Sequence, residues 1–257
     1  MPILILGGGR SGISVQARTN ERSDLLVGTR FLKDVSGNLV LDEFNLPQIE
    51  IDSDGNADFI LGQVQPDFML GWTHALTFKN FSIYLALDSQ IGGSIYSTSY
   101  SSGSASGTLT NSLLGRKAWY NSEKDRIALG YRPEEWIPTG GVSISGVNEA
   151  GASTTTFLNP ERYFSRLSGI NEANLFDASF IRLTEISLSY SLPKNWVSKI
   201  HLNACSFSLF GSNLGYLLRN TSGFSPQASL SSGKAQGIET YAFPTTRSIG
   251  IKANFQL

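Results

Sequence analysis

The chain has 257 residues, with 20 basic and 21 acidic side chains, and only 16% of its residues are charged. This balance excludes a nucleic-acid binder, which needs a surplus of basic side chains to neutralise phosphates. No apolar run approaches the roughly 20 residues that a membrane-spanning helix requires. One cysteine and two histidines exclude a disulfide framework and disfavour a His/Cys metal site. Strands of roughly 9–11 residues also cross membranes, so a soluble β domain and a membrane barrel both remain open.

The first residues contain a glycine-rich segment, Gly7–Gly12, that matches the pattern G-x-G-x-x-G. A dinucleotide site needs this loop to open a helix. The residues that follow, 13–20, alternate like a strand, which favours a turn between two strands. The segment also lacks the basic region and long apolar run of a signal peptide. We therefore expect either a soluble cytoplasmic chain or a piece of a longer precursor.

Residues 68–78 and 81–91 alternate strictly between apolar and polar side chains, and only Lys79-Asn80 separates them. This pattern predicts a β-hairpin with a tight turn. An arm of this length rises roughly 33 Å, or about 25 Å along the membrane normal at a 40° tilt. That height matches the apolar band of an outer-membrane barrel.

Three more strands are predicted downstream, over residues 178–192, 199–211 and 245–257. The last alternates most cleanly. In the first, Arg182 and Thr184 fall in the apolar phase, which predicts a β-bulge or an exit from the bilayer.

Short and long connections alternate along the chain. The turn at 79–80 and the stretch 193–198 are short, whereas 92–177 and 212–244 are long and rich in Ser, Gly and Asn. Outer-membrane barrels combine short periplasmic turns with long extracellular loops. In that arrangement several aromatic side chains form a girdle at the periplasmic interface, whereas in a soluble sandwich they belong to the core. They are Phe78, Phe81, Tyr190, Trp196 and Phe255.

These patterns favour an all-β fold: an antiparallel up-and-down transmembrane β-barrel, of which this chain forms one segment with long extracellular loops. Residues 1–67 are expected to hold one or more upstream strands and a loop. Residues 68–257 are expected to hold the five C-terminal strands.

A series of motifs carries a family resemblance, and they occur in a consistent order. They are Gly62–Phe68, Thr77–Ser82, Gly92–Tyr96, Asp177–Leu183 with its continuation to Pro193, Gly211–Leu214, Gly237–Glu239 and Pro244–Arg247. Together they resemble the C-terminal portion of the SusC/RagA family of TonB-linked outer-membrane proteins.

The resemblance implies a role and a set of partners. Members of this family are barrels of about 22 strands with an N-terminal plug. They pair with a SusD-like surface lipoprotein that acts as a lid, and they import glycans or peptides with energy from the TonB complex. The resemblance implies no cofactor and a place in the lipid of the bacterial outer membrane, as part of a longer precursor. The plug that contacts TonB is expected to be absent from this sequence.

Two departures from the family pattern stand out. Ser225-Pro226-Gln227 replaces a frequent Asp-Pro-Glu element, and the sequence finishes with Leu257 where the family usually has an aromatic residue. Phe255 and Leu257 keep the outward phase of the last strand, so we expect them to carry the barrel assembly signal.

No catalytic group is expected. Glu134 and Glu135 are adjacent on a loop and point apart, whereas a glycosidase pair needs a fixed geometry about a sugar. Flat aromatic side chains of the long loops can stack on sugars or peptides, or they can pack the loops together. The candidates for substrate contact are Trp119, Tyr120, Tyr131, Trp136, Tyr163 and Phe224.

Two alternatives to the transporter remain. The chain could be a soluble β-rich binding or adhesion module, or a truncated fragment without independent function. Because about five strands cannot close a barrel and open edges are not tolerated in lipid, the isolated chain is expected neither to transport nor to close a barrel.

Overall fold

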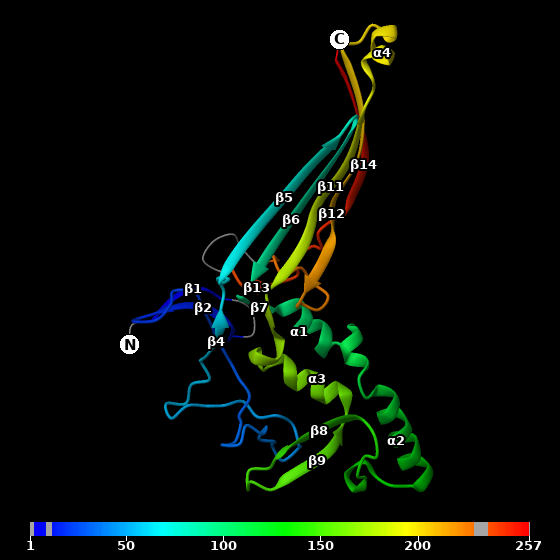
Figure 1. Cartoon of the computed structure of the whole chain (residues 1–257). Coiled ribbons are helices and arrows are strands. Elements are labelled where there is room, and N and C mark those ends of the chain that lie inside the picture. The colour runs from blue at the N-terminus through cyan, green and yellow to red at the C-terminus, as the bar shows by residue number, and fades with distance from the viewer. Residues whose placement is uncertain (1–2, 9–11, 229–235, 257) are drawn as a thin grey trace. The chain divides into compact units, whose positions relative to one another are not determined.

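The computed structural model describes residues 3–8, 12–228 and 236–256, and strands predominate over helices (Figure 1). The chain divides into two compact units, each built from three separate segments. The strand unit comprises residues 65–93, 177–227 and 243–257. The mixed unit comprises residues 1–64, 94–176 and 228–242.

The strand unit contains one antiparallel sheet in the order β14-β12-β11-β6-β5 (Figure 1). Its strands are β5 (Phe68–Phe78), β6 (Phe81–Ile91), β11 (Phe180–Ser191), β12 (Ala204–Arg219) and β14 (Ser248–Gln256). The short helix α4 (Lys194–Val197) and a 3-10 turn (Ser198–Ile200) connect β11 to β12. Within the described residues β5 and β14 are edge strands, and no closed barrel is formed. Strand β12 continues to Arg219, so the loop expected from residue 212 is shorter than predicted.

The register aligns apolar side chains in a row across all five strands. Leu76 pairs with Ile83, Ile83 with Leu188, Leu188 with Leu209, and Leu209 with Ile251. All five side chains are exposed, from 45% for Leu188 to 79% for Ile251. The next row is mainly aromatic, and the Phe81 and Tyr190 rings lie 4.7 Å apart. We call this face of the sheet the apolar face.

The opposite face carries small hydroxyl side chains at the neighbouring positions. Thr77, Ser82, Ser189 and Ser208 follow one another across four strands. The first two hydroxyls lie 3.0 Å apart and the last two lie 2.7 Å apart, so each pair forms a cross-strand hydrogen bond. Lys252 continues this row on β14.

A β-bulge in β11 restores the alternation of side chains in the upper half of the strand, which is one of the two outcomes that the sequence pattern predicts. The pairing with β6 shifts register between Leu183 and Glu185, so Thr184 is the extra residue relative to β6. The pairing with β12 shifts at the same place, but there the extra residue lies in β12, between Ser212 and Gly215. Because of this shift, Arg182 pairs with Asp88, and its Nη2 donates to Asp88 Oδ2 at 2.8 Å. Without the bulge, alternation would place the Arg182 guanidinium on the apolar face.

Asp177 joins the start of β11 to two other segments of the strand unit. Its carboxylate accepts from the Ser179 backbone N–H at 2.8 Å and hydroxyl at 2.5 Å, and from Asn220 Nδ2 at 2.8 Å. Ser179 Oγ in turn accepts from the Gly92 N–H. Burial raises the pKa of Asp177, but these hydrogen bonds outweigh it and hold the pKa below its ordinary value.

The described residues of the mixed unit form three small sheets. A four-stranded antiparallel sheet holds β1 (Ile3–Gly8), β2 (Ser14–Arg18), β3 (Leu25–Gly28) and β4 (Phe59–Gln63). A second holds β10 (Leu175–Asp177), β7 (Ser94–Ser97) and β13 (Ile238–Glu239), and β7 and β13 are parallel. The third is the hairpin of β8 (Val142–Val147) and β9 (Ser153–Leu158). A core of buried side chains joins the first two sheets: Ile13, Val15, Leu26, Tyr96 and Ile238.

The glycine-rich segment near the N-terminus does not form a dinucleotide fold. Strands β1 and β2 pair antiparallel on either side of it, whereas that fold needs a helix between parallel strands. Gly9, Arg10 and Ser11 themselves lie outside the described residues.

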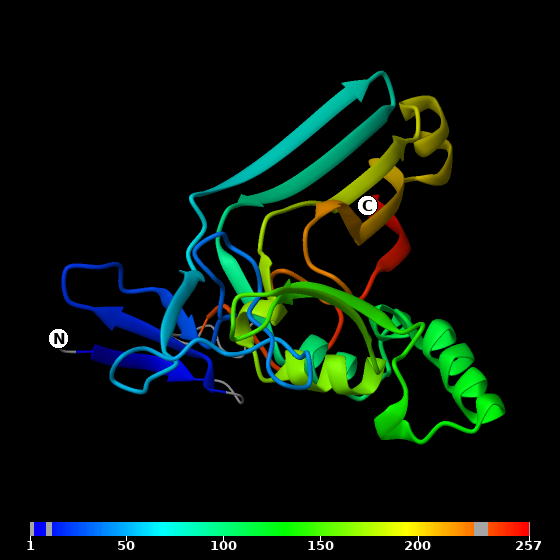
Figure 2. The ribbon, with the colours of Figure 1, turned by 90° about the horizontal axis from the view of Figure 1, so that it is seen from below.

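The segment 92–177 contains helices, so the expectation of an all-β chain is wrong here. The helices are α1 (Thr98–Ala105), α2 (Arg116–Leu129) and α3 (Pro160–Ser168), with 3-10 turns at Thr110–Leu113, Pro133–Glu135 and Asn171–Asn174. Both views show α3 beside the β8–β9 hairpin (Figures 1 and 2), and Tyr163 packs against buried Leu41, Ile144 and Leu158. Among the described residues, no helix has the length and apolar content to cross a membrane.

Buried Glu239 links β13 to the start of α1. Its carboxylate accepts from the hydroxyls of Ser97 at 2.5 Å and Ser99 at 2.6 Å, and from the Ala242 N–H at 2.9 Å. Ser97 also caps α1 by accepting from the Tyr100 N–H. One carboxylate, 1% exposed, therefore orders two segments about 140 residues apart in the sequence.

We predict that Glu239→Gln loosens both segments. An amide NH2 group cannot accept a hydrogen bond, so a buried donor loses its acceptor at a cost of about 1–3 kcal/mol. Hydrogen exchange on the purified full-length protein should be faster at residues 94–105 and 237–242. Glu134→Gln, an exposed change in the same unit, should leave exchange in both segments unchanged; equal protection in the Glu239 variant would contradict the link.

The two glycines that flank α2 offer a matched pair of substitutions. Gly115 and Gly130 have φ values of +75° and +77°, so alanine at either position costs about 1–2 kcal/mol of backbone strain. A Cβ at Gly115 would also lie 2.5 Å from the backbone of Gly141 and Val142, whereas a Cβ at Gly130 would meet nothing within 4 Å. We predict that Gly115→Ala deprotects residues 116–129 more strongly in hydrogen exchange than Gly130→Ala. Equal effects would show that the close approach at Gly115 carries no cost.

Candidate functional site

The five aromatic candidates that lie in the mixed unit do not converge on one site. Trp119 and Tyr120 lie on α2, and Tyr131 and Trp136 lie in the loop that follows it. Tyr163 lies on α3, and Phe224 belongs to the strand unit. Of these, Trp119 alone lines the cavity described next.

One cavity of the mixed unit has a volume of about 480 Å³ and lies among α1, α2 and α3. We call it the helical cavity. Its walls combine two charged side chains, Arg116 and Glu161, with the aromatic rings of Trp119 and Phe164. Small polar residues complete the lining: Ser104, Ser106, Gly107, Ser112 and Asn159, together with Ala105 and Pro160.

The α3 wall of this cavity is set by a strong helix start. Asn159 Oδ1 accepts from the Glu161 N–H at 2.8 Å, and Pro160 occupies the first helical position. Asn at the N-cap and Pro at the next position both favour helix initiation. The pair Asn159-Pro160 is therefore a signal in the sequence that could have placed Glu161 on a helix.

Tyr131 and Trp136 pack the loop after α2 instead of opening to a ligand. Their ring centroids lie 5.5 Å apart. Trp136 Nε1 and the Thr139 N–H both donate to the hydroxyl of buried Ser122, each at 3.0 Å. These contacts support a packing role, which is the alternative that the sequence leaves open.

Tyr163 is also a packing residue. It contacts the Leu41–Leu158 cluster and lies edge-on to Phe164, with centroids 5.2 Å apart. Burial raises the pKa of its phenol. In the last strand, Phe255 is exposed and its ring lies edge-on to Phe207, whereas Leu257 lies outside the described residues.

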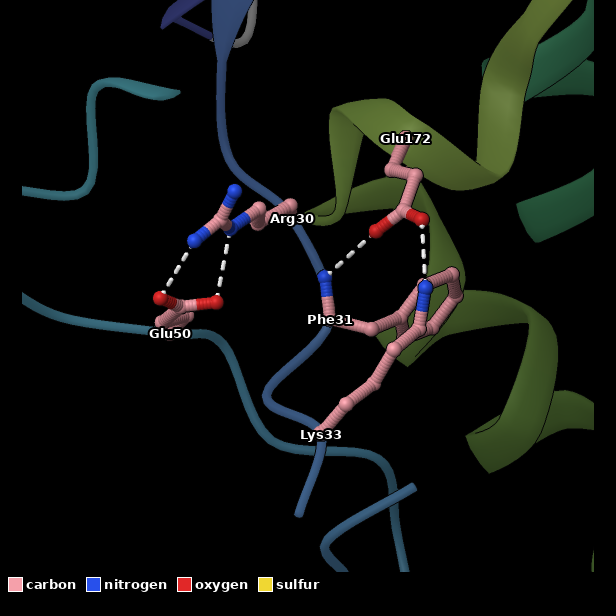
Figure 3. Close-up of polar contacts among 5 residues, drawn as sticks. All are labelled: Arg30, Phe31, Lys33, Glu50 and Glu172. Atoms are coloured by element: carbon pink, nitrogen blue, oxygen red, sulfur yellow. Dashed lines mark hydrogen bonds and ion pairs between the residues drawn. The ribbon is translucent and has the colours of Figure 1, made fainter. Parts of the chain in front are cut away.

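A cluster of charged residues, which the sequence does not single out, links the segment after β3 to the turn after α3 (Figure 3). Arg30 Nε and Nη2 donate to the two Glu50 oxygens, both at 2.6 Å. Glu172 accepts from the Phe31 N–H and from Lys33 Nζ, both at 2.8 Å. These five residues line a cavity of about 430 Å³.

The cluster is electrostatically satisfied. The bidentate hydrogen bond with Arg30 lowers the pKa of Glu50, and the same contact raises the pKa of Arg30. The Arg30 guanidinium carbon also lies 4.1 Å from the centroid of the Phe59 ring. Since both cations are paired with carboxylates, this cavity ties segments together and offers little unpaired charge to a ligand.

Glu134 and Glu135 lie in an exposed 3-10 turn, where Glu135 accepts from the Arg132 N–H at 3.3 Å. In the described part of the chain, no three acidic, His or Cys residues gather closely enough to hold a metal ion.

We predict that the Arg30–Glu50 pair contributes stability that acid removes. Because the folded pKa of Glu50 is lowered, the contribution is complete above its ordinary value near 4.5 and disappears as the pH falls through the folded pKa. The raised pKa of Arg30 keeps the upper limit beyond the usable pH range. Arg30→Gln should cost less than about 1 kcal/mol at pH 7 in low salt, because the pair is partly exposed, and less at pH 3 than at pH 7.

Protection factors for residues 29–50, corrected for intrinsic exchange rates, would measure this difference. Arg162→Gln is the control, since that exposed side chain has no ion pair among the described residues. A difference at pH 3 as large as that at pH 7 would assign the effect to the contact with Phe59.

Comparison with known proteins adds a likeness in sequence. No protein-family model matches the chain. It is 24% identical over 217 residues to TonB-dependent receptor P3 of Formosa agariphila. The match covers 80% of this chain but 18% of that protein, so this chain spans less than a fifth of its relative.

Solved structures add a likeness in fold. The RagAB peptide importer in its closed-closed state matches 95% of this chain with a TM-score of 0.55 and 14% identity. The RagAB peptide transporter matches 98% with a TM-score of 0.54 and 13% identity. In both cases the chain covers 24% of the solved chain. The likeness of this chain to SusC/RagA-type TonB-dependent proteins, which its motifs predict, is confirmed in sequence and in fold.

Proposed function

We propose that this chain is the C-terminal barrel segment of a SusC/RagA-type importer of the bacterial outer membrane. The observation that carries the proposal is the apolar face, on which Leu76, Ile83, Leu188, Leu209 and Ile251 form one exposed row. A patch of this kind is rare on soluble monomers and marks a surface for lipid or a partner. It therefore weighs against the soluble binding module.

The strand lengths support the same role. Strands β5 and β6 have 11 residues each and β11 has 12. At roughly 3.3 Å per residue and a tilt near 40°, 11 residues cover the apolar band of about 25 Å. The hydroxyl row on the opposite face suits a hydrated lumen.

The two edge strands explain why this segment would act within a longer protein. In lipid an unpaired edge leaves backbone N–H and C=O groups without partners. We propose that strands outside this sequence pair with β5 and β14 to close the barrel. The relatives are several times longer than this chain, which leaves room for them.

Partners and cargo follow from the family. We propose a SusD-like lipoprotein as the lid, the TonB complex as the energy source through a plug outside this sequence, and an oligosaccharide or peptide as the cargo. The relatives carry the names of a receptor and a peptide importer, and neither name is that of an enzyme. Trp119, Tyr120 and Phe224 remain candidates for substrate contact.

A charge scan of β14 in the full-length gene product tests the membrane assignment. Ile251 lies on the apolar face and Asn254 on the opposite face of the same strand. Lysine facing lipid is destabilising, by up to about 2–4 kcal/mol at the midplane and less towards the interfaces, whereas lysine facing the lumen is tolerated. We predict that Ile251→Lys reduces the heat-modifiable, folded protein in outer-membrane fractions, and that Asn254→Lys does not. Full solubility without detergent, or equal tolerance of both lysines, would contradict the proposal.

A further inference from the structure

We propose that the helical cavity binds one hydroxylated ring of a saccharide. This inference rests on the proposed import function only in treating the saccharide as cargo, because the binding itself follows from the walls of the cavity. It also separates this chain from its structural relatives, whose names specify a peptide.

The first wall group is a guanidinium that is fixed before any ligand arrives. Arg116 Nε donates to the Ser112 carbonyl at 2.7 Å, and Nη2 donates to the Gly107 carbonyl and to Ser112 Oγ, both at 2.8 Å. Among the described residues Arg116 makes no ion pair, and Nη1 makes no hydrogen bond. Two oriented N–H donors therefore remain for an acceptor, without the entropy cost of ordering the side chain.

The second wall group is a carboxylate without a partner. Glu161 lines the same cavity, but no N–H or ammonium group of the described residues bonds to its side chain, and it does not pair with Arg116. A ligand that fills this space must offer acceptors to Arg116 and donors to Glu161. Neighbouring hydroxyl groups of a sugar ring do both, because each hydroxyl donates and accepts.

The third element is an aromatic platform. Trp119 is half-buried and lies against the backbone of Gly141, where an added Cβ would be 3.1 Å from the indole. Phe164 is 6% exposed and fixed in the wall of α3. An apolar, aromatic wall with a few oriented polar groups is the usual composition of a small-molecule site, and 480 Å³ lies within the usual range of about 300–1,000 Å³.

A peptide fits these walls less well. Extended peptides bind by adding a strand to a sheet edge, and helical peptides need an apolar groove. The lining residues come from helices, 3-10 turns and their connections, and none comes from a strand. The cavity therefore offers no backbone ladder, whereas its charged and hydroxyl groups suit a ring.

Saturation-transfer NMR on the full-length protein, in a detergent without a sugar headgroup, tests the proposal. The probes are methyl glycosides of glucose, galactose, mannose, xylose and rhamnose, with trialanine as the peptide probe. We expect at least one glycoside to bind, with saturation of its ring protons. Glu161→Gln should weaken that binding about tenfold, because one hydrogen bond to a charged group is lost.

Matched variants separate binding from folding. Glu134→Gln removes an exposed carboxylate outside the cavity and should change affinity less than twofold. Trp119→Ala should abolish saturation of the ring protons, whereas Ile127→Ala, on the same helix and 67% exposed, should not. Hydrogen exchange across α2 and α3 checks that each variant is folded, and Glu161→Gln remains decisive if Trp119→Ala is not.

Three results would overturn the inference: no glycoside binds, glycoside binding is insensitive to Glu161→Gln, or trialanine binds and loses affinity in that variant. The proposed function fails separately, if the protein is soluble or its uptake activity does not depend on TonB. Sugar binding together with uptake that does not depend on TonB would contradict only the import proposal. TonB-dependent uptake without sugar binding would contradict only the proposal that the helical cavity binds a saccharide.

Discussion

The register of the five-stranded sheet is the constraint on which the rest of the strand unit depends. Side chains alternate between the two faces of the sheet with a period of two. If β11 slipped by one residue against its neighbours, Ser189 would therefore replace Leu188 in the apolar row. The cross-strand pairs from Leu76 to Ile251 show a common phase in all five strands. The bulge at Thr184 maintains that phase by turning Arg182 toward Asp88. Asp177 anchors the start of β11 through its hydrogen bonds with Ser179 and Asn220.

The sequence predicts the sheet well because its signals are local. Strict alternation and a two-residue turn locate β5 and β6 at residues 68–78 and 81–91, and a break in alternation locates the bulge. Helices α1 and α2 carry no such signal, whereas Asn159-Pro160 marks the start of α3. Helix α1 consists of Ser, Thr, Gly, Ala and one Tyr, and α2 is exposed almost throughout. The start of α1 depends on a distant contact, that of Glu239 with Ser97 and Ser99, which no local pattern contains.

Prediction of the site was less complete for a similar reason. Aromatic side chains are conspicuous in loops, so the sequence singles out Trp119, which lines the helical cavity. It equally singles out Tyr131, Trp136 and Tyr163, whose rings pack within the mixed unit. Arg116 and Glu161 are ordinary surface charges in the sequence, and their importance lies in being oriented yet unpaired around one cavity. Whether a charged side chain has an ion-pair partner depends on distances in the folded structure, which the sequence does not contain. For the same reason the Arg30–Glu50 contact could not be foreseen from two residues 20 positions apart.

The Glu239 contact also sets an order of events during biogenesis. The mixed unit is assembled from residues 1–64, 94–176 and 228–242, so its last segment leaves the ribosome long after its first. Helix α1 lacks the carboxylate that holds its N-terminus until Glu239 has followed, some 140 residues later. Contacts so distant in sequence slow folding, because a long loop must close first. Until Glu239 has been synthesised, the hydroxyls of Ser97 and Ser99 therefore lack this acceptor, so the contact that orders the start of α1 forms late in synthesis.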